Sequence, residues 1–174
     1  MLFRSNAAPV LSSFSRDALR SVEHLIVNKL EAEDLLNKRQ PASPTSWRRL
    51  EQGGDRDSEI VKGRELCTGL LDLGVKYAVV TMGGYGGVAG ANKKGGEYLI
   101  TEYKAVEAGR VADTTGCGGV FIGAYAVQYI RQKFSPGGFD LARAVNWAAK
   151  AAALSATSFG SLNGIPWEDQ VEAP

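Results

Sequence analysis

Hydrophobic and polar positions follow two different periods along this chain. Nearly continuous apolar runs at residues 24–27 and 77–81 predict short strands that are buried on both faces of a sheet. Residues 31–36 and 58–73 instead carry apolar side chains at helical spacing, and Gly74 ends the second of these predicted helices. A short helix is also expected to end near Val22, just before the first strand.

Turn residues divide the second half of the chain into a hairpin region and two helices. Short antiparallel strands are expected at residues 88–89 and 98–100, and a second hairpin-like pair at residues 103–106. An apolar helix follows at residues 120–130, and Pro136-Gly137-Gly138 separates it from an alanine-rich helix at residues 141–157. The order strand, helix, strand, hairpin, helix, helix predicts a layered α/β domain.

Residues 37–57 differ in composition from the rest of the chain. They contain Pro41, Pro44, Gly53 and Gly54 together with many charges and few apolar side chains. This composition is typical of an exposed insertion rather than of a linker between domains.

Composition and charge exclude several classes of function. The 174 residues suffice for one domain with a sizeable core. A formal net charge of +1 gives no electrostatic reason to expect nucleic acid or an anionic membrane as a partner. The two cysteines, Cys67 and Cys117, have no metal-type spacing and are expected to be free thiols in a cytoplasmic protein, with a nuclear location also open. The N-terminal composition is compatible with a transit peptide, but an interior loop at Asn6-Ala7-Ala8-Pro9 is favoured.

The most informative stretch is the glycine-rich turn Asp113-Thr114-Thr115-Gly116-Cys117-Gly118-Gly119, which leads into the apolar helix. Small residues allow several backbone N–H groups to point at one anion, and the start of a helix adds partial positive charge there. The turn therefore suits a phosphate group whose charge grows during transfer. A tight loop that needs positive φ values is the simpler alternative.

Two further motifs follow the predicted buried strands. Thr81-Met82-Gly83-Gly84-Tyr85-Gly86 lies at the end of the second strand, where ligands collect in open α/β sheets, although it could be only a hairpin turn. Asn28-Lys29-Leu30-Glu31 follows the first strand. A carboxylate there suits Mg²⁺, which keeps its waters and uses few direct protein ligands, but the motif could also be an ordinary helix start.

These three motifs and the alanine-rich C-terminal helix resemble, in order and spacing, those of the ribokinase-like (PfkB-type) carbohydrate kinases. In that family the turn reads Asp-Thr-x-Gly-Ala-Gly-Asp, and its last aspartate is the catalytic base. In this chain Gly119 stands at that position, while Gly116, Cys117 and Gly118 match the anion hole. The resemblance implies a partial ribokinase-like fold, a mostly parallel sheet flanked by helices with a small antiparallel hairpin region.

The resemblance also implies ligands and their residues. ATP or ADP would lie against Thr81, Gly83, Gly86, Asn28 and Ala149, the last at a position where the family often has asparagine or histidine. Glu31 would hold Mg²⁺ through water. Asp113 and the backbone of Thr115 would hold a monovalent cation such as K⁺.

The resemblance covers nearly all of residues 1–174 as a single nucleotide-binding portion, but only the C-terminal half of a kinase of this family. Weak or no sugar phosphorylation is therefore expected, because both the base and the sugar-binding half would be missing, and Met1 would be an internal start. The alternatives are a non-catalytic nucleotide-binding subunit that pairs with itself or a relative through an exposed sheet edge, or a truncated gene product.

Overall fold

The computed structural model describes residues 16–37, 55–93, 95–107 and 109–173. It forms two compact units, of which the first ends at Glu102 and the second begins at Tyr103. Most of the predicted insertion at residues 37–57 and the predicted loop at residues 6–9 lie outside the described residues.

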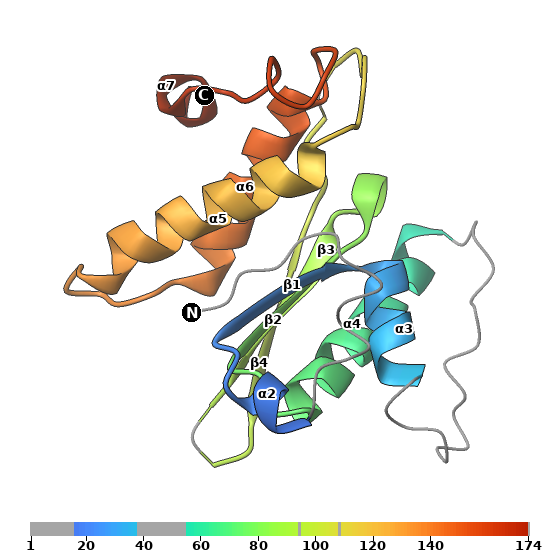
Figure 1. Ribbon diagram of the computed structural model, residues 1–174, viewed down its shortest axis with the longest axis vertical. Coiled ribbons are helices and arrows are strands. Elements are labelled where there is room, and N and C mark those ends of the chain that lie inside the picture. Colours follow the sequence, from blue (N-terminus) through green and yellow to red (C-terminus); the bar gives the residue numbers. More distant parts are fainter. Residues whose placement is uncertain (1–15, 38–54, 94, 108, 174) are drawn as a thin grey trace. The chain divides into compact units, whose positions relative to one another are not determined.

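The first unit is built on a four-stranded sheet (Figure 1). Its strands are β1 (His24–Asn28), β2 (Tyr77–Thr81), β3 (Gly87–Asn92) and β4 (Tyr98–Tyr103), in the order β1-β2-β3-β4. The pair β1–β2 is parallel and the pair β2–β3 is antiparallel, so the sheet is mixed. The two buried strands therefore lie where the apolar runs predicted them.

The strands of the hairpin region are longer than their apolar runs suggested, but the predicted second hairpin at residues 103–106 is wrong. Tyr103 ends β4, and residues 104–107 form neither helix nor strand. All four of these residues are exposed, so they have no apolar face that pairing in a sheet would bury.

Three helices accompany this sheet: α2 (Arg16–Arg20), α3 (Lys29–Asn37) and α4 (Arg56–Asp72). The Asp55 side chain caps α4 by accepting a hydrogen bond from the Ser58 amide at 3.0 Å. Gly74, with φ 98°, follows the end of α4, as predicted for this position.

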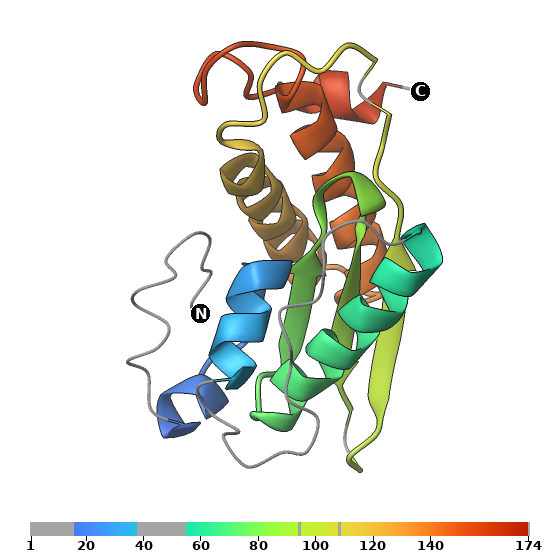
Figure 2. The same ribbon diagram turned by 90° about the vertical axis from the view of Figure 1, so that its right-hand side faces the viewer.

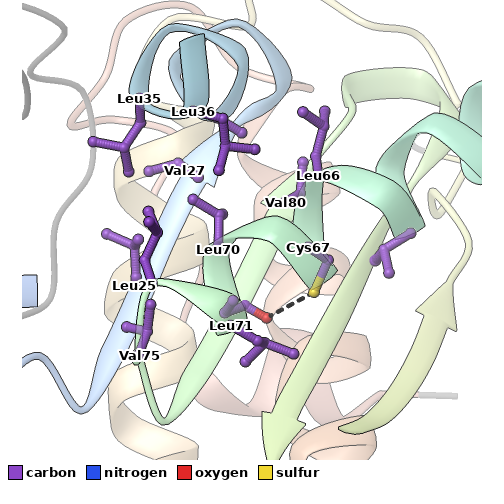
Figure 3. Packing of buried hydrophobic residues seen from close by; sticks show 14 of the residues in the cluster. Leu25, Val27, Leu35, Leu36, Leu66, Cys67, Leu70, Leu71, Val75 and Val80 are labelled. Atoms are coloured by element: carbon purple, nitrogen blue, oxygen red, sulfur yellow. Dashed lines mark hydrogen bonds between the residues drawn. The ribbon is translucent and has the colours of Figure 1, made fainter. Parts of the chain in front are cut away.

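The core of the first unit lies between α3, α4 and the sheet (Figure 3). Both helices and the strands β1 and β2 contribute buried aliphatic side chains to this core. These side chains include Leu25, Val27, Leu35, Leu36, Leu66, Leu70, Leu71 and Val80. The Cys67 thiol belongs to this core and donates to the Ala78 carbonyl over 3.6 Å (Figure 3). Continuous burial of β1 and β2 explains why both strands lack an alternating pattern.

The second unit consists of α5 (Cys117–Lys133), α6 (Leu141–Ser155) and the short α7 (Glu168–Glu172). Helices α5 and α6 pack side by side (Figure 2), and small buried residues such as Ala144 and Ala148 allow their close approach. The Glu168 carboxylate pairs with Arg131 of α5 and so attaches α7 to that helix. Within the part of the chain that the structure describes, no helix is long and apolar enough to span a membrane.

Candidate functional site

The first candidate site, named here the strand-end site, comprises Asn28, Glu31, Thr81, Gly83 and Gly86 at the carboxyl ends of β1 and β2. Asn28 and Thr81 are direct partners in the parallel register of these strands. The Thr81 hydroxyl also lies 3.5 Å from the Val27 carbonyl oxygen, to which it donates. The structure therefore brings together the two strand-following motifs of the first unit, at the sheet edge where α/β proteins bind ligands.

Asn28 and Glu31 hold each other through two reciprocal hydrogen bonds. The Glu31 amide donates to Asn28 Oδ1 at 2.9 Å, and the Asn28 amide donates to Glu31 Oε2 at 2.9 Å. This is the geometry of a capping box, and it satisfies two amides at the start of α3. The second carboxylate oxygen of Glu31, Oε1, accepts no hydrogen bond from the described residues, so it can accept one from a metal-bound water.

The glycines of the strand-end site form a tight turn between β2 and β3. The Met82 amide donates to the Gly86 carbonyl at 2.9 Å, and the Gly86 amide donates to the Gly83 carbonyl at 3.0 Å. Gly83 and Gly86 have φ values of 56° and 89°, which other residues adopt only with strain. The segment is thus a hairpin turn, and it follows Thr81, the strand partner of Asn28, at the carboxyl ends of β1 and β2.

A buried ion-pair network next to the strand-end site was not predicted from the sequence. Lys29 Nζ lies 2.6 Å from Glu59 Oε2, and Lys62 Nζ lies 3.3 Å from Glu59 Oε1. Burial raises the pKa of Glu59, but the hydrogen bonds from Lys29 and then Lys62 outweigh this and leave that pKa below its ordinary value. Glu33 is also buried, and its Oε1 has no hydrogen-bond partner among the described residues. Burial raises the pKa of Glu33 despite the opposing charge of Lys29.

The second candidate site, named here the anion turn, comprises residues 113–119 of the second unit. Gly116 caps α5 in a left-handed conformation with φ 89°. A Cβ at this position would lie 2.7 Å from Ser161 Cβ, so only glycine fits. Gly118 and Gly119 occupy the first turn of α5, where amides have no partner inside the helix, and both are exposed. Their N–H groups can therefore donate to an anion at the positive end of α5.

Cys117, which the sequence also assigned to the anion hole, is bonded within the protein. Its amide donates to the Thr114 carbonyl at 3.3 Å, and its sulfur accepts from the Ser155 hydroxyl at 3.3 Å. The Cys117 amide is therefore occupied, whereas the Gly118 and Gly119 amides make no such bond within the described residues.

The Asp113 carboxylate joins the anion turn to the C-terminal loop. Its Oδ1 accepts from the Thr115 amide at 2.8 Å, and its Oδ2 accepts from the Gly160 amide at 3.0 Å. Hydrogen bonds lower the pKa of Asp113 below its ordinary value: the largest effect comes from the Thr115 backbone, followed by the Thr115 side chain and the Gly160 amide. Asp113 is therefore ionised at neutral pH, and the free lone pairs of its oxygens are compatible with a monovalent cation.

The two remaining predicted positions differ in access. A Cβ added at Gly119 would meet nothing within 4 Å, so this position is open to solvent and to larger side chains. Ala149 is buried on α6, with 7% of its surface exposed.

Comparison with known proteins confirms the family resemblance. The model of the pfkB family carbohydrate kinases matches residues 5–168. A ribokinase of Dictyostelium discoideum is 27% identical over 157 residues, which cover 89% of this chain and 44% of the relative.

Solved structures show the same fold. A ribokinase of Giardia lamblia superposes with a TM-score of 0.70 at 23% identity, over 95% of this chain and 48% of that one. The Arabidopsis thaliana ribokinase, solved with ribose and ATP, gives a TM-score of 0.61 at 21% identity, over 90% of this chain and 42% of that one. The chain thus spans less than half the length of these relatives.

Proposed function

This chain belongs to the pfkB family of carbohydrate kinases, and we propose that it binds ATP or ADP with Mg²⁺ as the nucleotide-handling portion of an enzyme that phosphorylates a sugar hydroxyl. The observation that carries this proposal is the anion turn, which combines open glycine amides with the N-terminus of a 17-residue helix. The ATP bound by the Arabidopsis thaliana relative supports the choice of a nucleotide as the source of the phosphate.

The anion turn would bind the phosphate that is being transferred. Phosphoryl transfer depends mainly on positioning and on electrostatic stabilisation. The amides of Gly118 and Gly119 donate to phosphate oxygens, and the dipole of α5 favours the negative charge that accumulates on them. Neither effect needs a side chain, which explains why a run of glycines can serve as this site.

The strand-end site would hold the metal. The Glu31 carboxylate is fixed by the Asn28 amide and keeps one oxygen for a metal-bound water, as suits Mg²⁺ with most of its waters retained. Mg²⁺, when bound, neutralises charge on the phosphates. Asn28 and Thr81 present polar side chains at the same edge of the sheet for contacts with the nucleotide.

Gly119 implies that catalysis by this chain is slow. In the family pattern this position holds the aspartate that accepts the proton of the attacking hydroxyl, and glycine cannot accept a proton. A general base contributes about 10²- to 10⁴-fold to rate, so binding of nucleotide is retained while transfer is reduced. If the chain binds nucleotide but never transfers phosphate, it acts as a nucleotide-binding protein instead.

We also propose that Asp113 holds a monovalent cation. Its ionised carboxylate and its two backbone contacts support this assignment. These contacts hold the C-terminal loop against the anion turn, and a bound K⁺ would support them. Nucleotide binding is therefore expected to be stronger in a buffer that contains K⁺ than in one that contains only a larger organic cation.

Calorimetric titration with Mg²⁺–ADP tests the proposal. Wild type is expected to bind, and Gly118→Leu to bind at least about tenfold more weakly, because a bulky side chain obstructs the anion turn. Gly137→Leu is the control, since a Cβ there meets nothing within 4 Å and the residue lies in the loop after α5. Equal binding by wild type and Gly118→Leu would contradict the proposed phosphate site.

A further inference from the structure

A buried ion pair lies directly beside the strand-end site. Lys29 follows Asn28 and is the first residue of α3, whereas Glu59 lies in the first turn of α4. The Lys29 and Glu59 side chains are only 16% and 3% exposed, and their charged atoms are 2.6 Å apart. The pair therefore joins the beginnings of two helices at a point that water hardly reaches.

Both carboxylate oxygens of Glu59 are paired with lysines. Lys62, on the next turn of α4, occupies its second carboxylate oxygen at 3.3 Å. A buried carboxylate without a partner is strongly unfavourable, and the pKa of Glu59 lies below its ordinary value despite its burial. The carboxylate is thus ionised and fixed, and it in turn fixes the ammonium group of Lys29.

The other end of α3 is held by packing. A Cβ added at Gly69 of α4 would lie 3.1 Å from both methyl carbons of Leu36, so Leu36 packs closely over this glycine. The two contacts follow the same order along both helices, Lys29 with Glu59 and Leu36 with Gly69. Helix α3 is thus attached to α4 near each end, and the ion pair is the attachment adjacent to Asn28 and Glu31.

We infer that Lys29 and Glu59 are positioning residues for the strand-end site. Their ion pair fixes the first turn of α3 and thereby the reciprocal Asn28–Glu31 hydrogen bonds, which aim the Glu31 carboxylate. The effect on Mg²⁺ binding rests on the proposed function, whereas the claim that the ion pair fixes the first turn of α3 does not. Loss of a residue that orients a metal ligand typically lowers metal affinity about 10- to 100-fold.

The test compares Lys29→Met with Arg64→Met, which removes an exposed ion pair between Arg64 of α4 and Glu102. Two quantities are measured: amide hydrogen exchange at Asn28 and Glu31, and the free Mg²⁺ concentration that half-saturates binding of ADP. Lys29→Met is expected to speed exchange at both amides by about tenfold and to raise the Mg²⁺ requirement about 10- to 100-fold. Arg64→Met is expected to change neither quantity, and Lys29→Arg to restore both.

The double variant Lys29→Met with Glu59→Met separates positioning from stability. It removes both charges of the Lys29–Glu59 contact and leaves only the ammonium group of Lys62, which is 22% exposed, without its Glu59 partner. The double variant should therefore be less destabilised than Lys29→Met, yet both amides should still exchange faster and the Mg²⁺ requirement should stay high. Wild-type exchange at Asn28 and Glu31 in Lys29→Met or in the double variant would overturn the inference. A third outcome is that exchange is faster in Lys29→Met while ADP binding by the wild type does not depend on Mg²⁺. That outcome would support the positioning role of the ion pair and refute the proposed metal role of Glu31.

Discussion

Asn28 and Thr81 face each other as direct partners across the parallel strands β1 and β2. The motif that follows each strand therefore begins at the same edge of the sheet. Because Glu31 is bonded to Asn28 in both directions, its carboxylate is held at this edge as well. One strand pairing thus gathers the residues that we assign to the metal and to the nucleotide.

Restoring the missing carboxylate at position 119 should raise the phosphorylation rate. Gly119→Asp is expected to fold normally, because a Cβ there meets no neighbour within 4 Å. If a sugar binds, the new general base should increase the rate of Mg²⁺–ATP-dependent sugar phosphorylation by about 10²- to 10⁴-fold. Release of ADP with ribose as the acceptor is the measurement.

Gly123→Asp is the matched control for that gain. Gly123 lies one turn further along α5, is exposed, and also has nothing within 4 Å of an added Cβ. A similar gain in Gly123→Asp would show that added negative charge, rather than a base at the proposed position, causes the effect.

Neutralising Glu31 should weaken the response to Mg²⁺ with little loss of fold. In Glu31→Gln the side-chain oxygen still accepts the Asn28 amide, so the capping box survives. The charge that attracts a hydrated metal is lost, and the Mg²⁺ concentration for half-maximal ADP binding should rise about 10- to 100-fold. Asp34→Asn, an exposed change on the same helix, should leave this concentration unchanged.

The two cysteines should react very differently with thiol reagents. Burial raises the pKa of Cys67 to about 12, so this side chain stays a protonated, inaccessible thiol across the usual pH range. Cys117 is partly exposed at the anion turn. Iodoacetamide should modify Cys117 alone in the folded protein, as read by mass spectrometry, and Mg²⁺–ADP should slow that reaction. If Mg²⁺–ADP does not slow the modification of Cys117, that result would argue against a ligand at the anion turn.

Asp113 should stabilise the second unit in a pH-dependent manner. Its pKa is lower in the folded protein than in the unfolded chain, so its stabilising effect is present above the ordinary pKa near 4 and is lost as the pH falls through the lowered value. Asp113→Asn should therefore lower the urea midpoint of unfolding at pH 7, and this difference should shrink as the pH falls below about 4 through the lowered pKa. A difference that stays constant as the pH falls would mean that the charge of Asp113 is not the cause.

The sequence predicted the parts of this structure that local patterns determine. Continuous apolar runs located β1 and β2, and the motifs that begin at Asn28 and Thr81 were placed at the ends of these strands. That the two residues are direct partners is seen only in the structure. Gly74 located the end of α4 because only a residue that tolerates positive φ fits there.

Long-range polar contacts were not predictable in the same way. Lys29 and Glu59 are 30 residues apart, and no local pattern indicates that they pair. The same holds for the Gly160 amide, which reaches Asp113 across 47 residues. Helix α7 escaped prediction because its five residues are too short to show a helical period and depend on the contact of Glu168 with Arg131.

The most direct test of the nucleotide-binding proposal is the amide NMR spectrum of the chain on addition of Mg²⁺–ADP. The account predicts that the amide resonances of Gly118 and Gly119 shift more than those of other glycines, such as Gly137 in the loop after α5, because their N–H groups bond the phosphates. Saturating Mg²⁺–ADP that leaves the Gly118 and Gly119 resonances in place would contradict the assignment of the anion turn as the phosphate site.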